Sequence, residues 1–399
     1  MKRIYERILK DHFKHNNQMA FVVGPRQVGK TTTSGQLRKG HHYFNWDNLD
    51  DREIILKGPK NIADACSLNL LTKSKPLIIF DEIHKFSKWK VFLKGFYDTY
   101  KEDCNIVVTG SSRMDTYRRG GDSLMGRYFT YRMHPVSLRE SLEKNHVRDK
   151  EYASPLITGD DVFKNLLAFG GYPEPFLKGN QAFYRKWIRL RLDQLFKEDI
   201  RDLSRVQEID QLEVLGRLLI AQSGQLTSYT SLSKKVRVSV DTIRRWIDIL
   251  SSLYFCYKVR PWSKNVSRSL IKEPKVYLWD WSLCTDRGAR HENFIASHLL
   301  KSIHLWNDTG MGDYDLYYLR DKEKREVDFL ITKDNTPWTM IEVKSSETGL
   351  SRSLTHFQKQ LAVPHCFQVV IDLPYVSRDC FSLTGIRVVP AKTFLSQLA

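Results

Sequence analysis

A chain of 399 residues, 41% of them apolar, is long enough to form two or three globular domains with cores of their own. Its 63 lysine and arginine residues outnumber its 46 aspartate and glutamate residues, which gives a formal net charge of +17. Such an excess favours a polyanionic partner, most often a nucleic acid. The alternative is a basicity that affects only solubility.

Membrane and export functions are disfavoured by the sequence. The six cysteines are scattered, with no C-x-x-C pair and no zinc-ligand spacing, so we expect them to be reduced and buried. Residues 1–18 are charged and predict an amphipathic helix without the apolar segment of a signal peptide. No stretch reaches the length of a membrane-spanning helix. The sequence therefore predicts a cytoplasmic protein with no membrane partner.

The stretch G-P-R-Q-V-G-K-T fits the phosphate-binding pattern G-x-x-x-x-G-K-[ST] at every fixed position. Residues 19–23 before it predict a buried strand, and residues 31–37 after it can open a helix, which is the context that this motif needs. Backbone N–H groups would hold phosphate oxygens, Lys30 would reach the β- and γ-phosphates, and Thr31 would hold Mg²⁺. A chance glycine-rich turn is the alternative. The predicted cofactors are ATP and Mg²⁺, and the predicted nucleotide-binding residues are Gly24, Pro25, Arg26, Gln27, Val28, Gly29, Lys30, Thr31 and Thr32.

Two further apolar runs end in polar residues. Residues 77–82, L-I-I-F-D-E, predict a buried strand that delivers two acids at its carboxyl end, where open α/β sheets bind ligands. Asp81 would hold Mg²⁺ and Glu82 would polarise the attacking water, unless Asp81 only caps the next helix. Residues 105–112 predict another strand, whose Thr109 or Ser111 would bond the γ-phosphate or the water. A plain polar turn is the alternative there. Residues 42–46 predict a strand, and 52–72 a helical stretch.

On these motifs, residues 1 to about 140 resemble the AAA-type P-loop ATPases of a large group of uncharacterised bacterial and archaeal proteins. The segment L-M-G-R-Y through P-V-S-L-R-E, within residues 124–140, also resembles that family's G-R…P-L-S-x-x-E element. In such proteins an arginine after the third strand often contacts the γ-phosphate of its own or a neighbouring subunit. The resemblance makes Arg127 the arginine-finger candidate, with a structural ion pair as the alternative. Arg113, Arg118 and Arg119 are weaker candidates.

The middle of the chain is predicted to be helical. Residues 141–160 predict a charged linker, 170–176 a turn that matches the family's G-G-x-P-E element, and 181–203 a basic amphipathic helix. Residues 208–262 predict a winged helix-turn-helix, with helices at 212–219, 229–236 and 240–250 and a wing strand at 254–259. On the third helix Thr242, Arg244 and Arg245 would face outward, toward a DNA groove and its phosphates. A protein–protein module is the alternative.

A second group of charged residues lies in predicted strands near the carboxyl terminus. Residues 275–280, 313–320, 326–331 and 340–345 predict strands, and residues 290–300 a helix. Glu342 and Lys344 are two apart and therefore share one face, and Asp328 begins the adjacent strand of a hairpin. Two carboxylates suit Mg²⁺, and a lysine would stabilise charge on an attacked phosphate. A surface ion pair is the alternative.

This pattern resembles the restriction-endonuclease-like core, whose signature is D-x(n)-[DE]-x-K with an acid on a preceding helix, and Glu292 matches that acid. The R-E-V-D-F…E-V-K-S wording also resembles nucleases of the Holliday-junction resolvase type. The resemblance implies a Mg²⁺ site of Glu292, Asp328 and Glu342 with Lys344 in a catalytic role. Degenerate domains of this type that only bind are the alternative.

The sequence thus predicts an α/β protein with four parts. These are a P-loop AAA-type ATPase domain at 1–140, a helical linker at 141–205, a winged helix at 206–265 and a restriction-endonuclease-like domain at 266–399. We expect an ATP-hydrolysing, DNA-binding homo-oligomer whose carboxyl-terminal site makes it an ATP-regulated DNA nuclease. The alternative is an ATP-driven switch that binds a protein or nucleic-acid partner and has a non-catalytic carboxyl-terminal domain.

Overall fold

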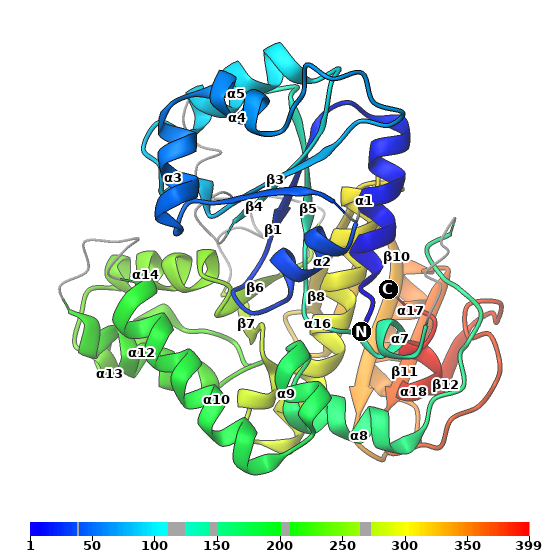
Figure 1. Cartoon of the computed structure of the whole chain (residues 1–399). Helices are drawn as coiled ribbons and strands as arrows, with labels where there is room; N and C mark the ends of the chain where they lie inside the picture. The colour runs from blue at the N-terminus through cyan, green and yellow to red at the C-terminus, as the bar shows by residue number, and fades with distance from the viewer. Residues whose placement is uncertain (38–39, 111–123, 144–149, 201–207, 264–272, 399) are drawn as a thin grey trace. The chain divides into compact units, whose positions relative to one another are not determined.

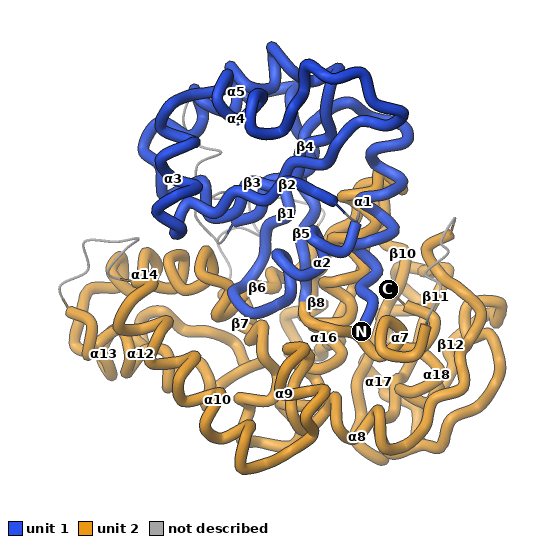
Figure 2. The backbone as a smooth tube through the Cα atoms, viewed as in Figure 1, with its two compact units in different colours: residues 1–134 blue, residues 135–399 orange. Residues whose placement is uncertain are grey.

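The computed structural model describes residues 1–37, 40–110, 124–143, 150–200, 208–263 and 273–398. The chain forms two compact units, residues 1–134 and 135–399, which Figure 2 shows in different colours. Both are α/β in character, as the sequence predicts. The division of the second unit into linker, winged helix and nuclease-like domain stays a prediction.

Unit 1 is built on one parallel sheet with strand order β2-β3-β4-β1-β5, of which Figure 1 labels β1, β3, β4 and β5. Strands β1 and β3 are buried along their whole length because parallel strands are covered on both faces. Phe21, Phe80 and Val108 share one core with helices α3 to α5. The strands are β1 (Met19–Val23), β2 (His42–Asn45), β3 (Leu77–Asp81), β4 (Asn105–Gly110) and β5 (Tyr128–Arg132), and the helices are α1 (Ile4–His15), α2 (Lys30–Gln36), α3 (Leu49–Leu56), α4 (Pro59–Ala65), η1 (Ile83–Lys85) and α5 (Trp89–Tyr100).

The helical stretch predicted at 52–72 is wrong in its extent. The chain forms α3 and α4 instead, which are separated at Gly58, and α4 ends at Ala65. Pro59 occupies the first turn of α4, where its missing N–H leaves no helical hydrogen bond unmade. A proline at this place cannot continue the preceding helix, which is why one predicted helix becomes two.

Unit 2 contains a seven-stranded mixed sheet in the order β12-β11-β10-β9-β8-β6-β7. Strand β9 is antiparallel to both of its neighbours, β8 and β10, and β11 and β12 then run parallel to β10. The strands are β6 (Cys256–Pro261), β7 (Lys275–Leu278), β8 (Tyr314–Arg320), β9 (Glu326–Lys333), β10 (Thr336–Lys344), β11 (His365–Val370) and β12 (Ile386–Pro390).

Two helices cover opposite faces of the centre of this sheet. Side chains of α16 (Arg287–Asp308) share a core with Phe329 and Ile341, whereas those of α17 (Arg352–Leu361) share another with Leu330 and Met340. Neighbouring residues of a strand point to opposite faces, so these strands need apolar residues at successive positions. The short η4 (Trp281–Leu283) and α18 (Ala391–Leu395) complete this region.

The helices that precede the sheet follow the predicted order with shifted ends. Helix α10 ends at Gln194 and continues as a π-helical turn, and residues 201–203 of the predicted helix lie outside the described residues. The predicted wing strand begins at Cys256, and β6 pairs with both β7 and β8, so it belongs to the main sheet. The helices are α7 (Leu138–Leu142), α8 (Asp160–Phe169), α9 (Pro173–Lys178), α10 (Gln181–Gln194), η3 (Leu195–Asp199), α12 (Ile209–Ala221), α13 (Tyr229–Val236) and α14 (Val240–Ser252).

The segment that enters unit 2 is anchored on α16. Lys301 forms a buried ion pair with Glu140 and donates to the Pro135 carbonyl at 3.0 Å. His298 Nε2 accepts from the Leu138 N–H at 3.0 Å. The G-G-Y-P-E element packs here too, since the Val136 N–H donates to the Gly171 carbonyl at 2.6 Å. The P-V-S-L-R-E and G-G-Y-P-E segments therefore contact each other where the chain enters unit 2.

All six cysteines are free and buried, as the sequence predicts. Across the described ranges, none of the helices combines the length and apolar character that a membrane crossing requires.

Candidate functional site

The phosphate-binding loop lies at the carboxyl end of β1, between that strand and α2. Gly24 has φ +153°, and a Cβ there would lie 2.3 Å from the Met133 carbonyl oxygen, so no other residue fits. Gly29 is the left-handed N-cap of α2, with φ +98°. Strand, loop and helix are in the predicted order, which leaves the free N–H groups of α2 directed toward the loop.

The side chain of Lys30 is buried and folds back over its own loop. Its Nζ donates to the carbonyl oxygens of Gly24 at 2.9 Å and Pro25 at 2.8 Å. These carbonyls stand in for the phosphate oxygens that the motif would hold. Burial lowers the Lys30 pKa to about 8, against the opposing effect of Glu82 and Asp81.

Asp81, at the end of β3, is the centre of a hydrogen-bond network. Its Oδ2 accepts from Thr31 Oγ1 at 2.8 Å and from the Tyr43 hydroxyl at 2.7 Å. Its Oδ1 accepts from Thr109 Oγ1, and from the Glu82 N–H at 3.1 Å. The predicted nucleotide residues Thr31, Asp81 and Thr109 therefore converge. Asp81 does not act as the N-cap of the following turn, because that position belongs to Glu82.

Glu82 follows directly, in the left-handed region with φ +53°. Burial raises its pKa, against the opposing charge of Lys85. Its Oε2 lies 3.6 Å from both His84 Nε2 and Lys85 Nζ, and it accepts no hydrogen bond from the described residues. A strained, half-buried carboxylate of raised pKa is suited to accept a proton.

Arg127 is not close to the loop of its own chain. It precedes β5, which runs parallel to β1 with Tyr128 opposite Met19, so it lies at the amino end of the sheet. Its guanidinium forms a two-pronged ion pair with Asp98, at 2.7 and 3.0 Å. This is the structural pair of the alternative interpretation, and it holds Arg127 at the end of the sheet opposite the loop of its own chain. Ser111, Arg113, Arg118 and Arg119 lie outside the described residues.

Two residues of this site escaped the sequence analysis. Tyr43, on β2, reaches Asp81 from a strand that carries no motif. Arg3, just before α1, is buried and donates to the Val28 carbonyl at 2.5 Å and the His134 carbonyl at 2.6 Å. Arg3 therefore braces the phosphate-binding loop against the last residue of unit 1. The only signal in the sequence was an arginine just before an amphipathic helix, and this does not indicate which residues it contacts.

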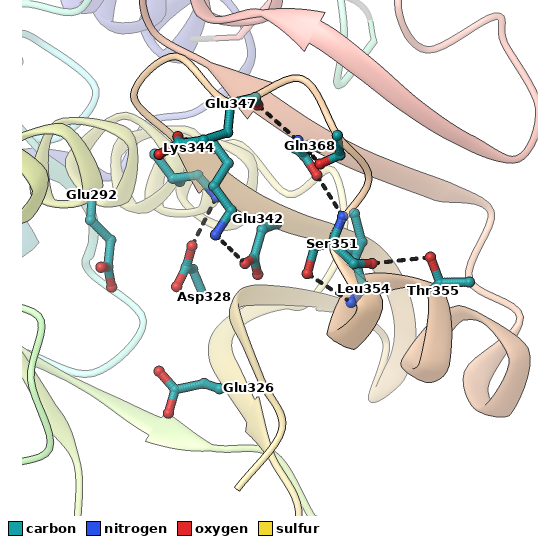
Figure 3. A network of polar contacts seen from close by, with 12 residues as sticks. Glu292, Glu326, Asp328, Glu342, Lys344, Glu347, Ser351, Leu354, Thr355 and Gln368 are labelled. Atoms are coloured by element: carbon teal, nitrogen blue, oxygen red, sulfur yellow. Dashed lines mark hydrogen bonds and ion pairs between the residues drawn. The ribbon is translucent and has the colours of Figure 1, made fainter.

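In unit 2 the predicted acids come from α16 and two neighbouring strands, as Figure 3 shows. The register pairs Phe329 with Ile341, so Asp328 and Glu342 lie on adjacent strands, and Asp328 Oδ2 accepts from the Val343 N–H at 2.8 Å. Lys344 donates to Glu342 Oε1 at 2.8 Å. The predicted grouping of Asp328, Glu342 and Lys344 is present.

An unpredicted lysine lies among these acids. The Nζ of Lys275, from β7, is 3.1 Å from Glu292 Oε1, 2.7 Å from Glu326 Oε1 and 3.9 Å from Asp328 Oδ1. Burial alone would lower the pKa of Lys275, but these three carboxylates outweigh it and raise that pKa. Glu326 shares a strand face with Asp328, which its spacing of two could have indicated.

Both central acids titrate near neutrality. Burial, followed by the charge of Glu292, raises the pKa of Asp328 to about 7. Burial, followed by the charge of Asp328, raises the pKa of Glu342 to about 7. Within the described ranges, no three Asp, Glu, His or Cys side chains are arranged to hold a metal ion. The predicted metal set of Glu292, Asp328 and Glu342 does not fit a metal in this conformation, because the Lys275 ammonium lies between its members.

The predicted DNA-contacting residues lie near the amino end of α14. Arg244 and Arg245 are exposed, whereas Thr242 is partly covered and its N–H donates to the N-cap Ser239 at 3.0 Å. Arg244 lies 3.8 Å from Asp241 of its own helix and over the ring of Tyr229. The opposite side of the helix, with Ile243, Trp246 and Ile247, is buried as predicted.

Comparisons with known proteins divide the chain into three parts. Residues 16–142 match the family model of an AAA domain, and residues 160–288 and 287–393 match two models that are each described as a domain of unknown function. An uncharacterized protein of Methanocaldococcus jannaschii is 25% identical over 362 residues, which cover 86% of this chain and 79% of that protein. An uncharacterized protein of Mycobacterium tuberculosis is 22% identical over 359 residues, which cover 85% and 73%.

Among solved structures, the Walker-type ATPase of Pyrococcus abyssi covers 70% of this chain and 93% of its own, at 12% identity and a TM-score of 0.45. None of these matches describes residues 266–399 as restriction-endonuclease-like. With the loop, Lys30 and the Asp81 network in place, the match to residues 16–142 supports an AAA-type P-loop fold for the amino-terminal part of the chain.

Proposed function

We propose that unit 1 binds ATP with Mg²⁺ and hydrolyses it between the phosphate-binding loop and the end of β3. The observation that carries the proposal is the convergence of Thr31, Thr109 and Tyr43 on the single carboxylate of Asp81. In P-loop ATPases the threonine of the loop and an acid at the end of a nearby strand hold Mg²⁺ together, and Thr31 and Asp81 are in contact here.

The residues have separate roles in this proposal. Lys30 exchanges its two carbonyl contacts for phosphate oxygens, and the N–H groups at the start of α2 complete the anion site. Thr31 and Asp81 are the groups that would hold Mg²⁺, which neutralises charge on the phosphates when bound. Glu82 accepts the proton of the attacking water, and Thr109 fixes the orientation of Asp81.

A homo-oligomer is part of the proposal. Arg127 lies at the amino end of the sheet and its own loop at the carboxyl end, so an arginine-finger role requires a second copy of the chain. To act in this way, Arg127 must exchange its pair with Asp98 for the phosphate of a neighbour. Its exposed position makes that exchange inexpensive, because surface ion pairs contribute little to stability.

Replacing Lys30 with alanine tests the nucleotide site. We expect the affinity for ATP to fall about tenfold to a hundredfold, because charge-assisted hydrogen bonds contribute roughly 1.5–3 kcal/mol each. The dissociation constant of a fluorescent ATP analogue, measured by anisotropy with Mg²⁺, provides the readout. Lys60→Ala, on the exposed side of α4, is the matched control. Equal affinities of both variants and the wild type would exclude nucleotide binding through Lys30.

We further propose that unit 2 binds DNA. The support is the net charge of +17, together with Arg244 and Arg245 exposed on α14 above a buried apolar face. Three helices followed by the β6–β7 hairpin have the order of a winged helix, in which the third helix enters the major groove. Lysine and arginine contacts to phosphates would make this binding strongly dependent on salt.

Beyond DNA binding, we propose a nuclease-like role for the carboxyl-terminal site. It is supported by Asp328 and Glu342 on adjacent strands, with Lys344 paired to Glu342. The order α16-β8-β9-β10-α17-β11 also carries Glu292 on the first helix and the other residues on the central strands, as in the restriction-endonuclease-like core. The alternative, a switch with a non-catalytic second unit, is favoured by the Lys275 ammonium among the acids.

Glu342→Ala separates these two roles. Purified protein is incubated with supercoiled, linear and branched DNA, with Mg²⁺ or Mn²⁺, and with or without ATP. If the site is a nuclease, cutting should fall at least about tenfold in Glu342→Ala, because a direct carboxylate contributes more than the supporting groups that typically cost 10–100-fold. Glu323→Ala, an exposed acid before β9, should cut as the wild type does. ATP hydrolysis without cutting by any form would favour the switch.

A further inference from the structure

Lys275 is the most enclosed charged group of the acidic cluster in unit 2. Its side chain is 4% exposed, and it contacts carboxylates from both α16 and β9. Its backbone is held in place by the turn between α12 and α13. The Thr227 N–H donates to the Pro274 carbonyl and the Gly224 N–H to the Val276 carbonyl, both at 2.9 Å. The ammonium is therefore a fixed part of the cluster.

The cluster carries more negative than positive groups. Its acids are Glu292, Glu326, Asp328 and Glu342, whereas its cations are Lys275, Arg320 and Lys344. With every group ionised, four negative charges face three positive ones. Glu342 Oε2 is buried and accepts no hydrogen bond from the described residues. Glu342 Oε2 is therefore an oxygen of the cluster that a further cation could contact.

A divalent cation cannot bind these acids while Lys275 keeps its place. The ammonium is within 3.1 Å of Glu292 and 2.7 Å of Glu326, distances at which a carboxylate oxygen is already engaged by a cation. A Mg²⁺ or Mn²⁺ ion on the same oxygens would lie only a few ångströms from the ammonium, and like charges at that separation repel strongly in a buried site. Metal and lysine therefore compete for Glu292, and Asp328 Oδ1 lies 3.9 Å from the same ammonium.

We infer that Lys275 is an internal cation that lies against Glu292 and Asp328, two of the three acids of the predicted divalent-metal set, and blocks metal binding there until its ammonium is displaced. The inference rests on the nuclease-like role proposed above and adds a residue that excludes the ion from the predicted metal set. Without Lys275, four acids whose side chains are between 8% and 24% exposed would face only two cations. A cation of one kind or the other is needed to hold them together.

Mn²⁺ binding to the full-length protein tests the inference. Free Mn²⁺ is measured by electron paramagnetic resonance during titration of the wild type, Lys275→Met and Lys333→Met. Lys333 is the matched control, since it lies on the same sheet but pairs with Glu151. We expect Lys275→Met to bind Mn²⁺ at least tenfold more tightly than the wild type, and Lys333→Met to bind as the wild type does. Adding Asp328→Asn to Lys275→Met should abolish the gain.

Thermal unfolding provides a second readout. Lys275→Met should melt at a lower temperature than the wild type in EDTA, and Mn²⁺ should restore most of the loss, whereas it should hardly change the wild type. If Lys275→Met does not fold, the double variant Lys275→Met/Glu326→Gln removes one charge of each sign and should show the same gain in Mn²⁺ affinity.

Two results overturn the inference, and they differ in what they say of the metal site. If the wild type binds Mn²⁺ and the folded Lys275 variants bind it no more tightly, Lys275 does not compete and the metal site stands. If no folded variant binds Mn²⁺ at millimolar concentration, the metal site itself falls, and with it the inference.

Discussion

Replacing Glu82 with glutamine should slow ATP hydrolysis by about 10²–10⁴-fold while ATP binding stays nearly unchanged, since a positioned general base contributes rate factors of this size. Glutamine keeps the size of the side chain but cannot accept a proton from water. Glu82 lies beside Asp81 with its Oε2 free of hydrogen bonds from the described residues, so the substitution breaks no network. The turnover number and the dissociation constant for ATP, measured on the same preparation, separate the two effects.

Glu53→Gln serves as the control for this experiment. Glu53 is exposed on α3, so its loss of charge should leave turnover and binding unchanged. A Glu82→Gln protein that hydrolyses ATP at the wild-type rate would show that another group activates the water. A variant that also loses ATP binding would assign Glu82 to the nucleotide pocket instead of the chemical step.

Replacing Lys301 with methionine should lower the free energy of unfolding of unit 2 by about 3–5 kcal/mol, the cost of leaving one partner of a buried ion pair without the other. The side chains of Lys301 and Glu140 are 2% and 0% exposed, so water cannot take over the lost contact. The ammonium also holds the Pro135 carbonyl, whose hydrogen bond is lost at the same time. Urea unfolding followed by tryptophan fluorescence measures the change.

The double variant Lys301→Met/Glu140→Gln should recover much of this loss, because no unpaired charge remains buried. Lys197→Met is the matched control, since Lys197 and Asp193 form an exposed pair of the kind that contributes about 0–1 kcal/mol. If Lys301→Met costs no more than Lys197→Met, the pair with Glu140 does not anchor the segment that enters unit 2.

The local motifs could be predicted because their chemistry depends on near neighbours in the sequence. Lys30 and Thr31 follow a fixed spacing, and the apolar run before Asp81 indicates where its strand ends. A spacing of two places Glu342 and Lys344 on one face without any knowledge of the rest of the sheet. Element ends were less certain, as Pro59 shows by dividing a helix whose apolar pattern continues.

Contacts between distant parts of the chain could not be predicted. Tyr43 lies 38 residues from Asp81, and Lys275 lies 51 from Glu326, counted as 326 − 275. Arg127 shows the limit of a motif, since the G-R pattern indicates an arginine but not the end of the sheet to which it belongs. In each case the partner is decided by strand order and register, which a single sequence does not specify.

Helix α16 contacts both residues 135–140, where the chain enters unit 2, and the acidic cluster. His298 and Lys301 of this helix contact residues 135–140. Glu292 lies nine residues before Lys301, which is about 14 Å along the helix at 1.5 Å per residue. The entry segment follows β5 without interruption, and the Met133 N–H just before it donates to the Val23 carbonyl at 2.7 Å, directly ahead of the phosphate-binding loop. A change in the contacts of residues 135–140 with His298 and Lys301 would therefore act on the same helix that carries Glu292.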